Sequence, residues 1–540
     1  MTVTGTQRDQ SWRRLSIRML LVHPVRELGR AVPALIGLVV AGRSVGGGEA
    51  WWLGPVGVVL VIALSVLRWA TTRYRITPEQ VQLRTGLLQR KTVAAPADRV
   101  RSVDVTASPL HRLLGLAKVD IGTGSHGSGG RGGSGLVLDS LPAAEAAALR
   151  AELLHRIAVP LKATVEGLAQ AVEERDTELP EAQLADIQPS DTELARLDPQ
   201  WVRFAPFTMS GVLAAAAILG LAWNLLDQFQ VTPSDVGTVK GLLGHLARTA
   251  IWLDVLQGVV VLATVVTALS IGGYVLSYWG FRLSRHAHGS LHVTRGLLTT
   301  RATSIEERRL RGVELSEPLL LRSVHAARLS GITTGLESKG RADGGSSLLL
   351  PPAPVAVARA VASEILRNPT AMEVSLSAHG AAARRRRFLR ALMPAFVLVA
   401  VAGLAVWSGA PSVVGVAAIL TIPVAAALAG DRYRSLGHAL SGGALVTQQG
   451  SLGRRRDVLD CDGIIGWNLR RTFFQRRAGL ATLTATTAAG RQGYAVTDLP
   501  LAMAVALGNR AVPGLLGEFL VPEVAEIPLT RSPPTSGERT

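Results

Sequence analysis

Basic side chains at strand-like spacing are the first residues of this sequence that could carry out specific chemistry. Lys91 is followed by Arg99 and Arg101, and residues at alternate positions of a strand point to one face of a sheet. Ammonium and guanidinium groups on one face can hold an anionic headgroup through charge-assisted hydrogen bonds. Arginine is frequent along the whole chain, and a solvated strand face explains the same spacing. We favour the solvated face and keep these three residues as candidate headgroup contacts.

Three histidines lie close together in the sequence R-H-A-H-G-S-L-H. His286 and His288 could share one face of a strand and, with His292, ligate a metal ion. No carboxylate or cysteine beside them completes a typical ligand set. We therefore predict no metal site at these histidines.

A glycine-rich stretch, Gly124 to Gly135, could cradle a phosphate group with its backbone N–H groups. It lacks the G-K-[ST] ending of a phosphate-binding loop, and no helix follows it directly. We interpret it as a flexible loop that joins two strands.

The single cysteine of the chain, Cys461, is flanked by Asp460 and Asp462. Neighbouring carboxylates raise the pKa of a thiol and suppress the reactive thiolate, so we assign Cys461 no role. One cysteine also excludes an intramolecular disulfide and a cysteine-based zinc cluster. The sequence contains no H-E-x-x-H, G-x-S-x-G or Walker motif, and we predict neither an enzyme nor a bound cofactor.

Composition predicts a protein that lies partly in a membrane. Of the 540 residues, 48% are hydrophobic, and the formal net charge is +17. The arginines cluster beside apolar runs, where anionic lipid headgroups explain them better than nucleic acid does. We therefore expect membrane lipids, and no nucleic acid, among the partners.

Six apolar stretches approach the roughly 20 residues that a spanning helix needs. They form three hairpins, and the first and fifth stretches, 28–45 and 391–408, are weaker because each contains a proline or is short. Tryptophan and tyrosine residues lie at the ends of the better stretches, as is typical of the membrane interface. The six stretches are 28–45, 51–69, 207–226, 253–276, 391–408 and 413–430.

The charges of the connecting segments predict the orientation of these hairpins. The short segments within each hairpin are nearly neutral, whereas the N-terminus, the long connections and the tail are rich in arginine. Arginine and lysine are retained on the cytoplasmic side of a membrane. We expect a multi-pass protein of the cell membrane with both termini in the cytoplasm.

A repeated module follows each hairpin. Each copy contains a strand, a glycine turn and a second strand, around Gly86, Gly296 and Gly450. Each copy ends with proline and an alanine-rich run of helical character, since proline suits a first helical turn. The sequence thus predicts an α-helical membrane part combined with α+β modules, each an antiparallel sheet with a C-terminal helix.

A second motif supports the repeat. Residues 108–124 resemble residues 473–483, and the middle copy keeps only Glu317-Pro318-Leu319 with an Arg322 that looks shifted. We assign this motif a structural role. Its matching residues are Arg112, Gly115 and Leu116 in the first copy, and Arg476, Gly479 and Leu480 in the third.

Domain boundaries follow from these hairpins and modules. An acidic stretch poor in apolar residues is expected to be a solvated linker, and the tail is expected to be disordered. The predicted parts are a basic cytoplasmic N-terminus (1–27), hairpin 1 (28–69), module 1 (70–160), an acidic linker (161–203), hairpin 2 (204–279), module 2 (280–368), a basic linker (369–390), hairpin 3 (391–430), module 3 (431–522) and a disordered tail (523–540).

The glycine turn, the S-P-L-x-R-L-L-G-L segment and the leucine-proline helix start resemble the bacterial pleckstrin-homology-like (PH-like) domain of the second type. The arrangement of hairpins and several modules looks like the YdbT-type membrane proteins of that family. The resemblance implies cytoplasmic PH-like modules held at the membrane that associate with each other or bind partners. It does not imply an enzyme.

Two functional hypotheses remain. The first is a non-enzymatic membrane scaffold whose modules bind each other or another protein, in envelope stress tolerance or secretion. The second is a lipid-binding protein, or a transporter of lipids or small molecules, with a cavity in the helix bundle. The second requires polar residues that face each other across the helices, and the apolar stretches offer few.

Overall fold

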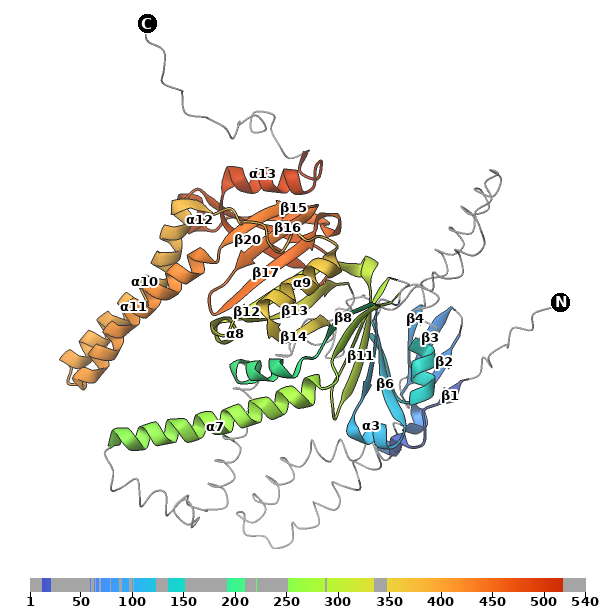
Figure 1. Ribbon diagram of the computed structural model, residues 1–540. Coiled ribbons are helices and arrows are strands. Elements are labelled where there is room, and N and C mark those ends of the chain that lie inside the picture. The colour runs from blue at the N-terminus through green and yellow to red at the C-terminus, as the bar shows by residue number, and fades with distance from the viewer. Residues whose placement is uncertain are drawn as a thin grey trace, which may run out of the picture. The chain divides into compact units, whose positions relative to one another are not determined.

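The structure, a computed structural model, is shown in Figure 1. It describes residues 12–20, 69–77, 79–86, 90–96, 102–122, 135–150, 192–208, 251–286, 289–334 and 347–517, and isolated residues between 59 and 100 and at 220. Both stretches of hairpin 1 and the first stretch of hairpin 2 lie almost wholly outside the described residues.

The first module consists of two antiparallel sheets with a shared core. The first sheet has the order β1-β2-β3-β4, and the chain then continues through β5, the short helix α3, β6, β7 and a helix over 143–150. Val81, Val103 and Leu138 are fully buried between these elements. The bounds are β1 Arg13–Arg14, β2 Arg73–Ile76, β3 Gln80–Thr85, β4 Lys91–Pro96, β5 Ser102–Ala107, α3 Pro109–Leu113, β6 Leu116–Gly122 and β7 Gly135–Pro142.

The second sheet of module 1 continues into module 2. Its seven strands have the order β7-β6-β5-β11-β10-β9-β8, so that β5 of the first module pairs antiparallel with β11 of the second. The side chain of Thr303 on β11 donates a hydrogen bond of 3.0 Å to Asp104 on β5, 199 residues away. The added strands are β8 Thr192–Arg196, β9 Arg282–His286, β10 Ser290–Arg295 and β11 Thr300–Glu306.

The same arrangement joins module 2 to module 3. A six-stranded sheet has the order β14-β13-β12-β17-β16-β15, and β12 pairs antiparallel with β17. The elements are η6 Glu307–Arg309, β12 Leu310–Pro318, α8 Leu319–Ser323, β13 Ala326–Thr333, β14 Leu348–Pro354, α9 Val355–Leu366, β15 Gly437–Ser441, β16 Ala444–Gln449 and β17 Gly453–Asp460.

Module 3 ends with a sheet of the order β18-β19-β20. Helix α13 packs on it, and Leu483, Tyr494 and Leu507 are buried in the core between them. The elements are η8 Cys461–Gly463, β18 Gly466–Arg470, α12 Phe473–Arg477, β19 Leu480–Thr486, β20 Gly493–Pro500 and α13 Leu501–Ala511.

The three modules share one register. Gly86, Gly296 and Gly450 have φ angles of 105°, 107° and 103°, and each turn sets the pairing of the strands around it. Counted from these glycines, the pairing of Ser102 with Ile305 is equivalent to the pairing of Gly312 with Leu459. We call these two β-pairings, β5–β11 and β12–β17, the seams. Both seams therefore join equivalent strands in the same register.

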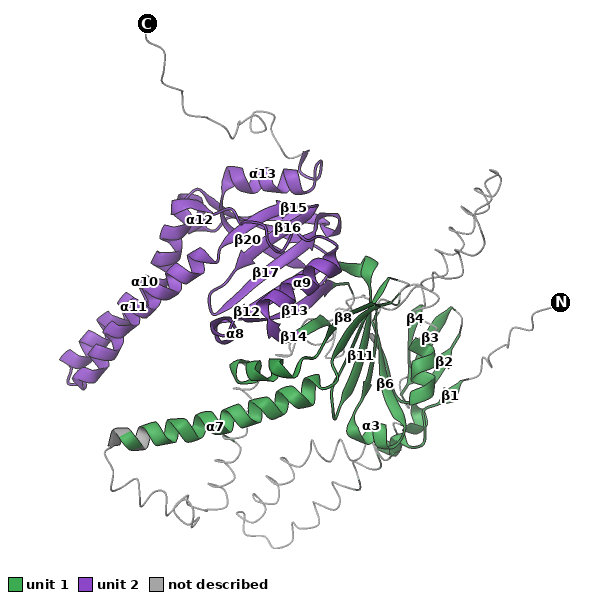
Figure 2. Ribbon diagram, in the orientation of Figure 1, with its two compact units in different colours: residues 1–310, 333–350 green, residues 311–332, 351–540 purple. Residues whose placement is uncertain are grey.

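The chain divides into two compact units that cut through module 2 (Figure 2). Unit 1 comprises residues 1–310 and 333–350, and unit 2 comprises residues 311–332 and 351–540. Each unit contains one seam. The division falls inside module 2 because each of its two sheets is continuous with a sheet of a neighbouring module.

Three of the described helices are long and apolar enough to cross a membrane. The first span is Leu256–Tyr278 of α7 (Ile251–Tyr278), and the others are α10 (Gly380–Trp407) and α11 (Ser412–Arg434). Helices α10 and α11 lie side by side as a hairpin (Figure 1).

The elements of the structure cross three of the predicted boundaries. Helix α10 begins at Gly380, inside the predicted basic linker, and runs through Pro394 without interruption. The predicted acidic linker contains β8 and the 3-10 helix η4 (Pro199–Phe207), whose Trp201 is buried. The predicted N-terminal segment contributes β1 and two buried side chains to the core of module 1, namely Leu15 and Met19.

Candidate functional site

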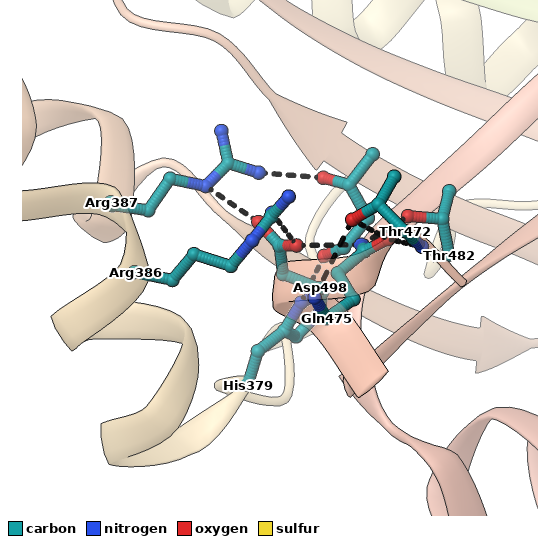
Figure 3. A network of polar contacts seen from close by, with 8 residues as sticks. His379, Arg386, Arg387, Thr472, Gln475, Thr482 and Asp498 are labelled. Carbon is teal, nitrogen blue, oxygen red and sulfur yellow. Dashed lines mark hydrogen bonds and ion pairs between the residues drawn. The ribbon is translucent and has the colours of Figure 1, made fainter. Parts of the chain in front are cut away.

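A buried carboxylate joins module 3 to the start of helix α10. Asp498, near the end of β20, is fully buried, and its carboxylate forms ion pairs with Arg386 and Arg387 of the helix (Figure 3). The Nε of Arg387 lies 3.0 Å from Asp498 Oδ2, and its Nη2 donates to the Thr497 hydroxyl at 2.8 Å. Two arginines thus compensate the desolvation of one carboxylate.

The short helix α12 binds the same carboxylate. Gln475 is buried and donates through Nε2 to Asp498 Oδ1 at 2.9 Å and to the Thr482 hydroxyl at 2.8 Å (Figure 3). The helix starts with a capping box, since the Thr472 hydroxyl accepts from the Gln475 backbone N–H and the Gln475 side chain accepts from the Thr472 N–H. Asp498 therefore fixes α10 and α12 to one strand.

Two buried histidines stand beside this cluster. His379 Nδ1 lies 2.8 Å from the Thr497 carbonyl oxygen, and its Nε2 lies 3.0 Å from His438 Nδ1. The carbonyl can only accept, so His379 donates from Nδ1 and accepts at Nε2 from His438. Burial, followed by the neighbouring His379 and Arg510, lowers the pKa of His438 to about 4. Burial also lowers the pKa of His379.

The short helices of all three modules are equivalent. Helices α3, α8 and α12 follow the cap residues Ser108, Pro318 and Thr472. Three positions after each cap stands a buried side chain, respectively His111, Leu321 and Gln475. In module 1, His111 Nε2 lies 3.2 Å from Asp139, which stands one residue before the counterpart of Asp498.

Arg322 is in register with the other two copies. It stands four residues after its cap, as Arg112 and Arg476 do, so the shift inferred from the sequence is wrong. A residue with left-handed backbone follows seven positions after each cap: Gly115 with φ 67°, His325 with φ 55° and Gly479 with φ 67°. Leu116 and Leu480 are buried at the starts of β6 and β19.

The seam between β12 and β17 carries a buried ion pair. Arg491 Nη2 donates to both carboxylate oxygens of Asp457 at 2.8 Å, and it lies 3.4 Å from Glu314 across the seam. Burial, partly offset by Arg491, raises the pKa of Asp457 to about 6. Opposite charges also face each other nearby, with Arg455 3.5 Å from Glu314.

Two of the edge strands in the described sheets, β4 and β18, lie at the positions that form the seams in the neighbouring modules. Strand β4 is equivalent to β11 and β17, and β18 is equivalent to β5 and β12, but neither has a strand on its outer side within the described part of the chain. Thr487 N–H donates to Gln492 on the β20 side, so the backbone groups of Thr486 and Thr484 face β18, where these residues pair with Gly466 and Asn468. The backbone N–H of Leu469, at the alternate position, therefore points outward.

The structure describes only some of the residues that were considered as ligand contacts. Lys91 is exposed at the start of β4, whereas Arg99 and Arg101 lie outside the described residues. The rings of His286 and His292 stack with their centroids 4.5 Å apart, and His288 is not described. Burial, followed by Arg150 and His286, lowers the pKa of His292 to about 3. His292 accordingly binds the Ser304 hydroxyl as a neutral ring.

Two further sequence predictions concern Cys461 and the glycine-rich stretch. Burial and then Asp460 and Asp462 raise the pKa of the Cys461 thiol to about 11, in the predicted direction. The stretch from Gly124 lies outside the described residues and connects β6 to β7.

Sequence reasoning missed Asp498, Asp457 and the open edge of β18. The available signal was small: Asp498 directly precedes the leucine-proline helix start, and Asp457 lies between three arginines and the apolar pair Val458 and Leu459. An acidic residue inside such a strand indicates a buried ion pair when basic residues are near.

Comparisons with known proteins agree with the repeat. The profile of the bacterial PH domain family matches residues 25–157 and 391–509, which cover modules 1 and 3 with their hairpins. The UPF0699 transmembrane protein YdbT of Bacillus subtilis (strain 168) is 20% identical over 299 residues. That similarity covers 54% of this chain and 56% of the relative, so the chain spans little more than half of the curated relative that it matches. No solved structure matches the chain significantly.

Proposed function

Because this chain is a membrane protein of the bacterial PH domain family, we propose that it is a non-enzymatic scaffold that joins PH-like modules to each other and to a protein partner at the cell membrane. The observation that carries the proposal is the pair of seams. Both seams use backbone pairing between separate modules, which is the chemistry by which β-strand addition recruits a partner.

The open edges of β4 and β18 are the places where the same pairing can continue. Each is equivalent to strands that pair inside the chain, and each carries exposed residues. An unpaired edge presents a row of backbone donors and acceptors and is a template for another strand. We propose that a strand of the partner binds at β18.

Charge decides against a second copy of this chain as that partner. Pairing β18 with β4 in the register of the seams would place Arg470 opposite Lys91, and like charges directly opposite are destabilising. In the seam of unit 2 the equivalent strands are complementary, with Glu314 facing Arg455 and Arg491. The partner strand at β18 should therefore carry acidic residues opposite Arg470.

The described spans support a scaffold better than a transport path. The Thr264 hydroxyl donates to the Val260 carbonyl of its own helix at 2.8 Å, and the Thr421 hydroxyl donates to Ala418 at 2.6 Å. Hydroxyls engaged by their own helix leave little polar surface for a substrate. Lipid or small-molecule transport is accordingly not our proposal.

The orientation is part of the proposal. Arginine at the start of α10 and at the end of α11 favours a cytoplasmic location for module 3 and for both termini. Reporter fusions after residues 409 and 517 test it: a cytoplasmic reporter should be active only at 517. A strain that lacks the protein should lose envelope stress tolerance or secretion if the scaffold acts there.

The partner proposal is tested by a proline at the open edge. Leu469→Pro removes one outward backbone N–H and leaves the pairing of β18 with β19 intact, and proline is tolerated on edge strands. Leu469→Ala is the matched control because it removes the side chain and keeps the donor. Full-length protein is purified under mild conditions from native membranes, and its mass and bound proteins are determined.

Loss of one bound protein in Leu469→Pro, with its retention in Leu469→Ala, is the expected result. The scaffold proposal would be abandoned if the unaltered protein carried no stoichiometric protein partner, or if both variants kept it.

A further inference from the structure

The three short helices α3, α8 and α12 have an inverted distribution of polar and apolar residues. Each helix exposes large apolar side chains beside polar ones, whereas the third position after the cap is buried and is polar in α3 and α12. Water-soluble surface helices show the opposite pattern. In α12, Phe473 is 63% exposed and Phe474 is 72% exposed, and the two rings stack edge to face.

The equivalent positions of the other modules repeat this feature. Leu110 of α3 and Leu320 of α8 stand at the position of Phe474 and are exposed, and Leu319 is exposed at the position of Phe473. Leu113, at the end of α3, is 86% exposed. Single exposed apolar residues need no explanation, but a large exposed apolar side chain at the same position in three copies of a module does.

Each short helix is attached to the end of a candidate membrane span in its own unit. In unit 1, Arg112 of α3 donates to the Leu297 carbonyl at 2.6 Å, and the Leu297 N–H donates to Leu276 of α7 at 3.0 Å. Leu298 beside this contact is exposed, as is Trp279 at the end of α7. An exposed tryptophan at the end of a span marks the membrane interface.

In unit 2 the connections are more direct. Arg322 of α8 lies 3.1 Å from Asp431 in the last turns of α11. Gln475 of α12 binds Asp498, which binds the first turns of α10 (Figure 3). The exposed apolar side chains are therefore held near the level at which α10 and α11 meet the interface.

Cationic residues accompany these apolar side chains. Arg470 and Arg471 precede α12, and Arg476 and Arg477 form its last turn. Basic residues flanking exposed aromatic rings are the composition of segments that lie in an interface with anionic lipid. A protein that covered the same patch would have to offer acidic groups and apolar area at the end of a span. Lipid is already present there and offers both.

We propose that α3, α8 and α12 are interfacial helices. Each inserts its exposed apolar side chains between anionic lipid headgroups, in the leaflet at the end of the span to which the helix is attached. This lipid contact is separate from the protein partner at β18. It places the modules flat against the membrane by three equivalent contacts instead of by their linkers alone.

The test uses the full-length chain in lipid vesicles with one fluorescent label. Cys461→Ser removes the native thiol, and Phe474→Cys provides the labelling site for an environment-sensitive dye. Asp462→Cys is the matched control: it is exposed in η8, at the far end of β18 from α12, and a five-residue strand spans about 16 Å. The vesicles contain phosphatidylcholine and phosphatidylglycerol, with a quencher attached to the lipid near the headgroup.

We expect a blue shift and quenching of about twofold or more at position 474, as for a residue buried in the headgroup boundary, and neither at position 462. Arg476→Gln with Arg477→Gln should reduce the quenching at 474, as should vesicles of phosphatidylcholine alone. Equal quenching at 474 and 462, or none at 474, would overturn the proposal. If quenching at 474 is the same in the arginine variant and in vesicles of phosphatidylcholine alone, the assignment to anionic lipid is wrong. The vesicles are prepared with this chain as their one protein, so these outcomes do not depend on the scaffold proposal.

Discussion

Gln475 Nε2 donates a hydrogen bond of 2.9 Å to Asp498 Oδ1, and this contact connects the short helix α12 to the strand that also binds Arg386 and Arg387. A single fully buried carboxylate thereby holds together a membrane span, an exposed aromatic pair and the last sheet. The contact gives the first prediction.

Asp498→Ala should destabilise unit 2 strongly. It leaves two largely buried arginines without their anion, and breaking a buried ion pair from one side costs about 3–5 kcal/mol. Asp498→Asn is the comparison, because asparagine tolerates the left-handed backbone of φ 60° and keeps an acceptor for Gln475. Thermal unfolding in detergent should rank the two variants, with alanine no more stable than asparagine. Wild-type stability of Asp498→Ala would contradict the role of the carboxylate.

The histidine pair predicts a loss of stability in acid. The folded pKa of His438, about 4, lies below its ordinary value of 6.5, so the unfolded chain binds protons first as the pH falls. Its contribution, on the order of 2 kcal/mol, is complete above pH 6.5 and is lost towards pH 4. His438→Gln should flatten this part of the pH profile of unfolding. If the free energy of unfolding of the variant still falls as steeply between pH 6.5 and 4, other groups cause the loss of stability in acid.

Asp457 predicts the opposite slope at the seam. Its folded pKa, about 6, is raised above its ordinary value of 3.8, so its contribution is present at low pH and is lost as the pH rises through 6. Asp457→Asn should remove this loss, and the β12–β17 seam should then be better protected at pH 8. Amide hydrogen exchange of peptides from β17 measures the effect, with peptides from β10 as the reference within the same molecule.

Two glycines should respond differently to alanine. A Cβ on Gly296 would lie 2.1 Å from the Thr299 carbonyl oxygen, at a φ of 107° that suits only glycine, whereas a Cβ on Gly280 (φ 62°) meets no atom within 4 Å. We expect Gly280→Ala to cost about 1 kcal/mol and Gly296→Ala to cost about 2–4 kcal/mol. Thermal unfolding distinguishes them, and equal losses would refute the role of this turn in setting the strand register.

Charge reversal at the open edge should create self-association. Arg470→Glu places an acidic residue where the seam register would bring Lys91 of a second copy. We expect the variant to form head-to-tail oligomers in detergent, detected by their mass, and Arg470→Gln to form fewer. A variant that stays at the wild-type mass would show that charge is not what keeps these two edges apart.

The repeat could be predicted from the sequence because its marks are local. Gly86, Gly296 and Gly450 indicate turns with a positive φ, which other residues adopt only at a cost in free energy. The strands beside them are predicted from alternating apolar residues. The membrane spans that the structure describes were predictable from their apolar length.

The seams could not be predicted in this way. The pairing of β5 with β11 is made by backbone groups, which every sequence supplies, between strands 199 residues apart at Asp104 and Thr303. Strand β8 was not predicted for a related reason. Its residues Thr192 to Arg196 lack alternating apolar side chains, and it is held by backbone pairing with β9. Asp498 was missed because a lone acidic residue beside proline usually signals a turn.

The seam between β5 and β11 also governs how the chain is made. At about 5–20 residues per second, the 199 residues between Asp104 and Thr303 take roughly 10–40 seconds to synthesise. During that time the ribosome has released β5 while its partner strand does not yet exist, and helix α7, a candidate membrane span, is synthesised in between. Translation speed and membrane insertion thus determine how long the growing chain carries an adhesive edge.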